Sequence, residues 1–201
     1  MKKLLIRTLQ TTFLLFLFSS GFGQEATMPL DGSSEFTIEG TSTLHNWSVE
    51  AQEVEGQITL GEAFASGNLP EKGTKISQLS VKVAVASMDG GKEVMNGKMH
   101  RALLKDTHPF ILFDLESADV HAIDPTSNSI ELEAKGNLSI AGVSQPAVLN
   151  VTGKAEAAEW TFTGSYPIKM SDFNIEAPTA MFGQIVTGDE VQVSFKLVTK
   201  P

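Results

Sequence analysis

The feature that most constrains this chain is an alternation of apolar and polar residues through almost all of its length after residue 34. Successive side chains of a β-strand point to opposite faces, so a period of two is typical of strands with one buried face. The clearest run has Leu79, Val81 and Val83 separated by Ser80 and Lys82. We therefore expect an antiparallel all-β protein.

The same pattern predicts eight or nine strands, separated by joints rich in glycine, proline and asparagine. The other candidate strands lie at residues 36–38, 43–51, 54–60, 111–115, 130–140, 147–155, 160–168 and 191–197. Amphipathic strands must stack as two sheets or close on themselves, and closure removes the exposed edges of the sheet. We therefore expect an eight-stranded antiparallel barrel over residues 35–201. An interior of that size is either filled by side chains or holds one slender ligand.

One segment has a helical period instead. Met95, Met99 and Leu103 are spaced by four residues, which places them on one face of a helix. The Gly90-Gly91 pair precedes the segment, and Pro109 follows it, where a helix cannot continue. The spacing predicts one short helix of about three turns within residues 92–105, inserted between two strands.

The first residues have the build of a secretory signal peptide. Lys2, Lys3 and Arg7 give a positive start, residues 13–18 are apolar, and small residues lie at 21 and 23. We expect residues 1–23 to be removed and a polar segment, residues 24–34, to precede the barrel. A membrane anchor is the alternative, but the apolar run is far shorter than the ~20 residues that span a bilayer.

Composition restricts the function further. Without the positive charges of Lys2, Lys3 and Arg7, the net charge of −9 becomes −12, which argues against binding nucleic acid or anionic membrane surfaces. The polar outward faces argue against stable insertion into a membrane. The chain has no cysteine, which excludes thiolate metal sites, cysteine nucleophiles and disulfides. An exported domain without disulfides fits a bacterial periplasm, so we expect a periplasmic or secreted protein.

No catalytic signature is present. The sequence lacks the nucleophile-elbow, phosphate-loop, dinucleotide and zinc-protease motifs. The four histidines, His45, His100, His108 and His121, lack the local spacing of a metal site. Ser42 with His45, or Ser171 with Asp172, could form part of a hydrolase, but most chains permit such combinations. We expect no enzyme, no metal and no cofactor.

The interior of the barrel is expected to be apolar and adaptable in shape. Methionine fills irregular space and suits varied apolar ligands. Two interpretations stay open: a core plugged by the helix, and a cavity for a lipid chain. Burial of each CH₂ group is worth about 0.8 kcal/mol, so a long chain could bind without any specific polar contact.

Several stretches in order resemble the YceI-like family of exported bacterial proteins. They include FTIEGTSTLHNW at 36–47, MHRALLKDTHPFILF at 99–113, GNLSIAGV at 136–143 and PIKMSDFNIEAPTAMF at 167–182. The resemblance extends over nearly all of the chain after the leader, and His45 matches the family's histidine in its strand. The chain departs from the family around residues 39–41, where many members have an aspartate.

The resemblance implies an eight-stranded antiparallel lipocalin-like barrel with a helix near its mouth. Characterised members bind a polyisoprenoid chain, such as a quinone tail, in an apolar tunnel. Carried onto this chain, Met95, Met99 and Leu103 would lie beside the tunnel, and Phe173 and the Met181-Phe182 pair would form part of its rim. With the inward positions of the strands, the candidate lipid-binding residues are Val83, Met88, Met95, Met99, Leu103, Phe113, Leu132, Phe162, Phe173, Met181 and Phe182.

Two hypotheses of function follow. The first is an exported, non-enzymatic protein that holds an isoprenoid or quinone-type amphiphilic lipid in the barrel, as a carrier or for sequestration. The second is a solid-cored envelope or stress protein that acts through its surface without a lipid. A continuous apolar cavity would favour the first, and an exposed apolar patch with no cavity would favour the second. The sequence leaves the oligomeric state open, a homodimer included.

Overall fold

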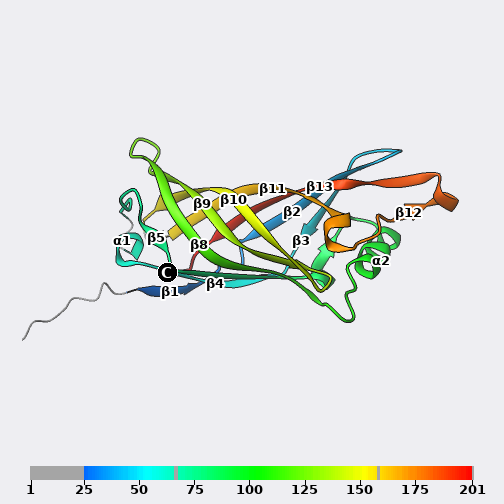
Figure 1. Cartoon of the computed structure of the whole chain (residues 1–201), viewed down its shortest axis with the longest axis horizontal. Helices are drawn as coiled ribbons and strands as arrows, with labels where there is room; N and C mark the ends of the chain where they lie inside the picture. The colour runs from blue at the N-terminus through cyan, green and yellow to red at the C-terminus, as the bar shows by residue number, and fades with distance from the viewer. Residues whose placement is uncertain (1–24, 66–67, 158, 201) are drawn as a thin grey trace, which may run out of the picture.

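The computed structural model describes residues 25–65, 68–157 and 159–200, and within these the protein is an antiparallel all-β fold with few helices (Figure 1). The leader expected at residues 1–23 lies outside the described residues. The nine longer strands are β2 (Glu35–Ser42), β3 (Trp47–Ala51), β4 (Val54–Leu60), β6 (Gln78–Ala84), β8 (Phe110–Asp124), β9 (Ser129–Ile140), β10 (Val143–Glu156), β11 (Glu159–Lys169) and β13 (Ile185–Val198). The short strands are β1 (Ala26–Pro29), β5 (Lys75–Ile76), β7 (Met88–Asp89) and β12 (Thr179–Ala180).

The expectation of eight strands is wrong, because the sheet of the described residues has 13. The nine candidates from the alternating pattern all correspond to the longer strands. The four others are two to four residues long, too short to show a period of two. One of them, β1, lies inside the polar segment expected to precede the barrel, where it pairs with β4 through Met28 and Ile58.

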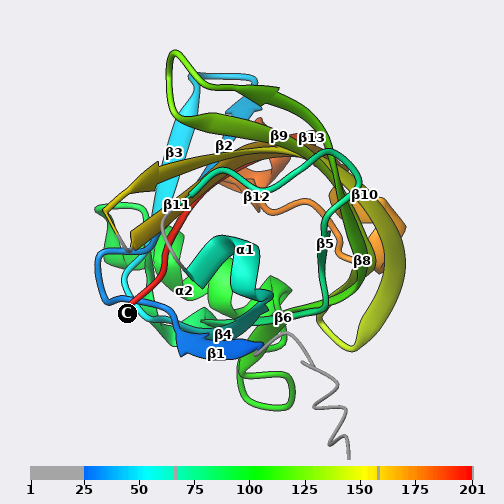
Figure 2. The same cartoon turned by 90° about the vertical axis from the view of Figure 1, so that its left-hand side faces the viewer.

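The strands form one curled sheet in the order β1-β4-β6-β8-β9-β10-β11-β13-β2-β3-β7. The curl brings β1 back to the end of β13, where Asp31 N donates to Val198 O at 2.7 Å and Lys200 N to Pro29 O at 3.0 Å. Figure 2, which looks along the sheet from one end, shows the resulting ring of strands. The apolar residues of the alternating pattern therefore face the inside of the ring.

β8 changes its inward side on the way. Its pairing with β9 shifts register between Leu115 and Ser117 and again between Val120 and Ala122. Such bulges bend a strand and move its side chains to the other face. As a result Phe113 and Leu115 face inward before the first bulge, and Ala118 and Val120 are buried after it.

The expected helix is α2 (Glu93–Ala102), between β7 and β8, in agreement with the period-four stripe. A second short helix, α1 (Glu62–Ala65), was not expected. The described residues also form three 3₁₀ turns, η1 (Val85–Ser87), η2 (Met170–Phe173) and η3 (Met181–Gly183). The two α-helices lie at opposite ends of the molecule (Figure 1).

The end that carries α1 is closed by aromatic packing. Phe64 and Trp160 are both fully buried, with ring centroids 5.2 Å apart in an edge-to-face arrangement. Trp160 Nε1 donates to Phe64 O at 3.0 Å, so α1 is tied to β11 by the indole as well as by packing. Phe162 also stacks on Trp160, with ring centroids 5.8 Å apart. Figure 2 shows α1 lying across this end of the ring.

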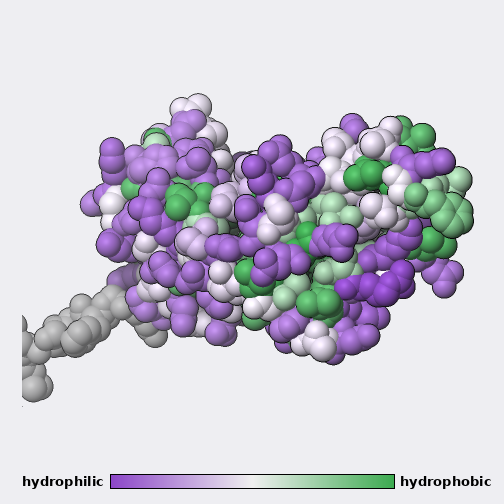
Figure 3. All heavy atoms as spheres, turned by 45° about the vertical axis from the view of Figure 1, so that its right-hand side comes forward, coloured by the Kyte–Doolittle hydropathy of each residue, from purple (hydrophilic) through white to green (hydrophobic). Residues whose placement is uncertain are grey.

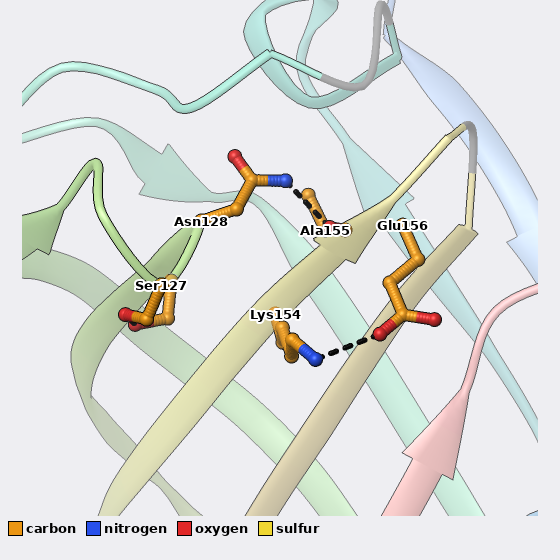
Figure 4. A network of polar contacts seen from close by, with 6 residues as sticks. Ser127, Asn128, Lys154, Ala155 and Glu156 are labelled. Atoms are coloured by element: carbon orange, nitrogen blue, oxygen red, sulfur yellow. Dashed lines mark hydrogen bonds and ion pairs between the residues drawn. The ribbon is translucent and has the colours of Figure 1, made fainter.

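Hydrogen bonds stabilise the β8–β9 turn at the same end. Asn128, in left-handed conformation (φ 53°), donates from Nδ2 to Ala155 O at 2.5 Å, and Ala155 N donates to Asn128 O at 3.1 Å. Figure 4 shows this bond beside the ion pair of Lys154 with Glu156 at 2.8 Å. These contacts join the β8–β9 turn to the end of β10, so the closed end is held by polar bonds at its surface and aromatic packing inside.

Candidate functional site

A cavity of about 450 Å³ lies inside the curled sheet, within the size range of small-molecule sites. Its wall comes from most of the longer strands and from α2, and it is almost wholly aliphatic and aromatic. The inward residues of β13 show the arrangement, since Val191, Val193, Phe195 and Leu197 all line the cavity while the polar residues between them do not. The period-two pattern is thus the direct cause of the apolar wall.

Eight of the sequence-predicted site residues lie on this wall. They are Val83, Met88, Met95, Met99, Leu103, Phe113, Leu132 and Phe162. They come from β6, β7, α2, β8, β9 and β11 and from the residue that ends α2, so the fold brings together positions that are far apart in the sequence. Phe162 lines the closed end of the cavity and stacks on Trp160, which does not line it.

The other three predicted residues do not line the cavity. Phe173 is buried in a second small cluster with Ile140 and Ile175 and is not among the lining residues. Met181 is largely exposed and Phe182 fully exposed, since both lie in a left-handed turn beyond the cavity's end. The wall near that turn is formed instead by Ala180 and Ile185.

The cavity opens at the end that carries α2, and polar contacts hold this helix in place. Asn96 Nδ2 donates to Asp89 Oδ1 at 2.7 Å, and Gly90 N donates to Asn96 Oδ1 at 2.8 Å. The His100 ring nitrogen Nε2 lies 3.0 Å from Met88 O. With these bonds on one side, Met95 and Met99 face the cavity. The helix therefore forms a wall at the mouth and does not fill the interior.

Polar lining residues concentrate at this mouth. Ser42, His45, Lys92, Lys98, Thr179 and Thr187 all belong to segments of the mouth, and Tyr166 is the exception on β11. Among the described residues, Lys92 and Lys98 are the charged residues of the lining, and no acidic residue contributes to it. The arrangement suits an amphiphile whose chain lies inside and whose head group accepts hydrogen bonds or carries negative charge at the mouth.

A carboxylate beside the mouth fixes η2. Asp189 accepts hydrogen bonds from Ser171 Oγ at 2.6 Å and from Ser171 N at 2.8 Å. These bonds, with a smaller contribution from the charge of Lys169, hold the pKa of Asp189 below its ordinary value of 3.8. Sequence reasoning paired Ser171 with Asp172, whereas the structure pairs it with Asp189, 18 residues away.

The histidines and serines do not assemble a reactive pair in the described residues. Ser42 Oγ donates to the main-chain oxygen of His45 at 2.8 Å, and His45 Nδ1 lies 2.8 Å from Asn46 O. No group of three or more His, Asp or Glu side chains that could hold a metal occurs in the described part of the chain. Among the same residues, no helix has the length and apolar character needed to cross a bilayer.

The fold and the cavity define a class: curled antiparallel β-proteins with a long apolar interior that opens beside a helix. A family model described as YceI-like domain matches residues 28–199. The chain therefore belongs to the YceI-like domain family, which confirms the resemblance in its sequence. None of the curated proteins compared with the chain matches it.

Solved structures share the fold at low sequence identity. BcnA of Burkholderia cenocepacia has a TM-score of 0.65 and 22% identity, over 85% of this chain and 99% of its own. A polyisoprenoid binding domain from Saccharophagus degradans, implicated in plant cell wall breakdown, has a TM-score of 0.65 and 16% identity, over 88% and 99%. A Campylobacter jejuni YCEI protein has a TM-score of 0.55 and 17% identity, over 76% and 84%.

Proposed function

We propose that this protein is an exported, non-enzymatic binding protein that holds the chain of an isoprenoid or quinone-type lipid in its apolar cavity. The observation that carries the proposal is the distribution of polarity. The wall is aliphatic and aromatic from Phe162 to the mouth, and in the part of the chain that the structure describes only Lys92 and Lys98 bring charge to the lining. The description of the Saccharophagus degradans neighbour as a polyisoprenoid binding domain supports the same class of ligand.

Export is part of the proposal and rests on the sequence of residues 1–23. A lipid chain has little solubility in an aqueous compartment such as the periplasm, and each CH₂ buried in the cavity contributes about 0.8 kcal/mol. A protein that shields such a chain from water could carry it or sequester it. The solid-cored alternative predicts a filled interior, and the cavity of about 450 Å³ argues against it.

The two tryptophans allow a direct test. Trp47 lines the cavity at its mouth, whereas Trp160 lies behind Phe162 and outside the lining. Because quinone rings quench indole fluorescence on contact, a delipidated protein titrated with an isoprenoid quinone should lose emission in a saturable way. The Trp47→Phe variant should lose most of that quenching while binding the same quinone, as measured by co-elution.

The matched control is Trp160→Phe, which should keep the quenching of Trp47. The proposal would be contradicted if the quinone caused no saturable quenching and if neither the isoprenoid quinone nor a plain isoprenoid alcohol co-eluted with the protein. Binding of the alcohol without quenching by the quinone would keep the cavity's role and exclude a quinone head group near Trp47.

A further inference from the structure

The mouth of the cavity carries apolar side chains that the fold does not cover. Leu44, Val94, Met181, Phe182 and Val186 are all exposed, Val94 to 76% and Phe182 completely. We refer to these five residues as the mouth rim. They come from the β2–β3 loop, α2, η3 and the start of β13, which lie at one end of the molecule in Figure 1. Figure 3 shows apolar surface gathered at that end.

Hydrogen bonds join these segments into one structure. Thr43 N donates to Val186 O at 3.0 Å, and Thr43 Oγ1 lies 3.2 Å from both Gln184 O and Val186 N. From the other side, Lys98 Nζ donates to Thr179 O at 2.6 Å, which ties α2 to β12. The mouth rim is therefore built on a connected frame around the opening, and its side chains are not on independent loops.

The tip of the rim has an unfavourable backbone conformation. Met181 and Phe182 both have left-handed backbone, with φ of 50° and 57°. Such a conformation is unfavourable for residues with a side chain, by about 1–2 kcal/mol each. Burial of the two side chains could compensate, but both are exposed. An apolar tip held out at this cost is typical of a surface that meets a partner.

The charge beside the rim differs from that of the rest of the chain. Residues 92–105 hold Lys92, Lys98, Arg101 and Lys105 against Glu93, whereas the whole chain has a net charge of −9. The stretch stays positive when the flanking Asp89 and Asp106 are included. The net negative charge of the whole chain argues against binding to anionic surfaces, but the net charge around α2, at the mouth, is positive.

We propose that the mouth rim docks on the surface of a lipid bilayer that contains anionic lipids, with the cavity opening toward the membrane. Single aliphatic and aromatic side chains with lysine and arginine beside them are the combination that binds the interfacial region of such bilayers. Docking in this orientation would let a lipid chain pass between bilayer and cavity without crossing water. This role of the rim rests on the proposed lipid-binding function, but docking itself is measured without any cargo.

The test is flotation of the purified protein with vesicles, half phosphatidylglycerol and half phosphatidylethanolamine, against vesicles of phosphatidylcholine alone. We expect the anionic vesicles to carry the protein, and salt to weaken this binding. Phe182→Ser should reduce the partition coefficient about tenfold, the effect of withdrawing one large apolar side chain from the interface. Arg101→Gln should reduce it about fivefold on anionic vesicles only.

The matched control is Val148→Ser, an exposed apolar residue of β10 outside the cavity lining, which should leave flotation unchanged. Phe182 and Arg101 do not line the cavity, so quinone quenching of Trp47 should be unaltered in both variants while transfer of the lipid from donor vesicles slows.

Equal flotation of wild type, Phe182→Ser and Val148→Ser would overturn the proposal. A wild-type protein that does not bind anionic vesicles would also overturn the proposal. This includes the case in which the protein self-associates through the mouth rim and Phe182→Ser abolishes that self-association. Failure of quinone binding with intact flotation would contradict the cargo and leave docking supported.

Discussion

At the residue scale, aromatic rings of the cavity wall lie over glycines of neighbouring strands. Phe195 covers Gly164, where an added Cβ would come within 2.6 Å of the ring, and Phe113 covers Gly136, where it would come within 2.7 Å. A glycine beside an aromatic ring lets the ring lie flat against the sheet. The width of the cavity therefore depends on the absence of side chains at these two positions.

The first prediction concerns Gly164. In Gly164→Val the new side chain should push the Phe195 ring into the cavity, because the neighbouring Asn150 O leaves no room on the other side. We expect weaker binding of an isoprenoid quinone and a loss of about 1–3 kcal/mol in the free energy of unfolding, the usual effect of overpacking. Titration and urea unfolding measure the two effects. Gly32→Val, at a glycine with nothing within 4 Å, is the control; equal binding by both variants would contradict the role of Phe195.

The second prediction concerns Met99, on the cavity side of α2. An arginine at this position would place a charge in the apolar part of the mouth or fold across the opening, and each arrangement disfavours entry of a lipid chain. Met99→Arg should lower lipid uptake at least about tenfold. Val148→Arg, on the exposed outer face, should take up lipid as the wild type does. Normal uptake by a folded Met99→Arg protein would show that the chain does not pass this residue.

Much of the wall was predictable residue by residue, because the alternation itself decides which side chains point inward. Val83, Leu132 and Phe162 lie on the wall for this reason. Phe173 and Met181 lie in irregular segments, where no period indicates orientation, and neither lines the cavity. Lys92, Lys98 and His45 line the mouth without any sequence signal beyond their proximity to the helix and the first loop.

At the scale of elements, the β9–β10 hairpin is closed by a two-residue turn, Ala141-Gly142, with φ of 50° and 82°. Both positions of such a turn require left-handed backbone, for which asparagine followed by glycine is the favoured pair. Alanine at the first position is unfavourable. The expected strands at 130–140 and 147–155 leave residues 141–146 as a joint, whereas β10 already begins at Val143. The sequence did not reveal the conformation of Ala141, because one glycine is compatible with several turn types.

The third prediction follows from that turn. Ala141→Asn should stabilise the protein by about 0.5–1 kcal/mol, since asparagine tolerates left-handed backbone better than alanine. Urea unfolding at neutral pH measures the change, and binding of lipid should stay the same. Ala86→Asn, in η1 where the backbone is not left-handed, should give no such gain. A loss of stability in Ala141→Asn would show that the turn differs from the one described.

The fourth prediction concerns the connection of η2 to β13 through Asp189. Its pKa is lowered in the folded protein, so its contribution to stability is present above the ordinary value of 3.8 and is lost as the pH falls through the lower folded value. The difference in unfolding free energy between wild type and Asp189→Asn should therefore shrink as the pH is taken from about 6 to about 2. A difference that stayed constant over that range would contradict the bonds from Ser171.

Strand number was the least predictable property of the elements. The nine longer strands show the alternation, but β5, β7 and β12 have two residues each and exist only because a neighbouring strand offers free backbone groups. α1 has four residues and depends on Phe64 and its contact with Trp160. Elements of this length are determined by tertiary contacts, and local sequence does not encode them.

At the scale of the whole molecule, the two ends differ in a way that suits a binding protein with one entrance. Aromatic packing of Phe64, Trp160 and Phe162 closes one end. The other end combines an opening, exposed apolar side chains and a stretch of net positive charge in an acidic chain. The composition alone shows the overall acidity and not this asymmetry, which arises only when the fold brings α2, the first loop and the β12–β13 turn together.

The central claim is that the cavity holds a lipid chain, and native mass spectrometry of the protein purified from its own cells tests it most directly. We predict a mass that lacks residues 1–23 and carries one adduct, which organic extraction identifies as an isoprenoid or isoprenoid quinone. Reconstitution of delipidated protein with the same lipid should restore the adduct, and Met99→Arg should lose it. A protein that is free of lipid on isolation and still takes up no isoprenoid lipid after reconstitution would contradict the account.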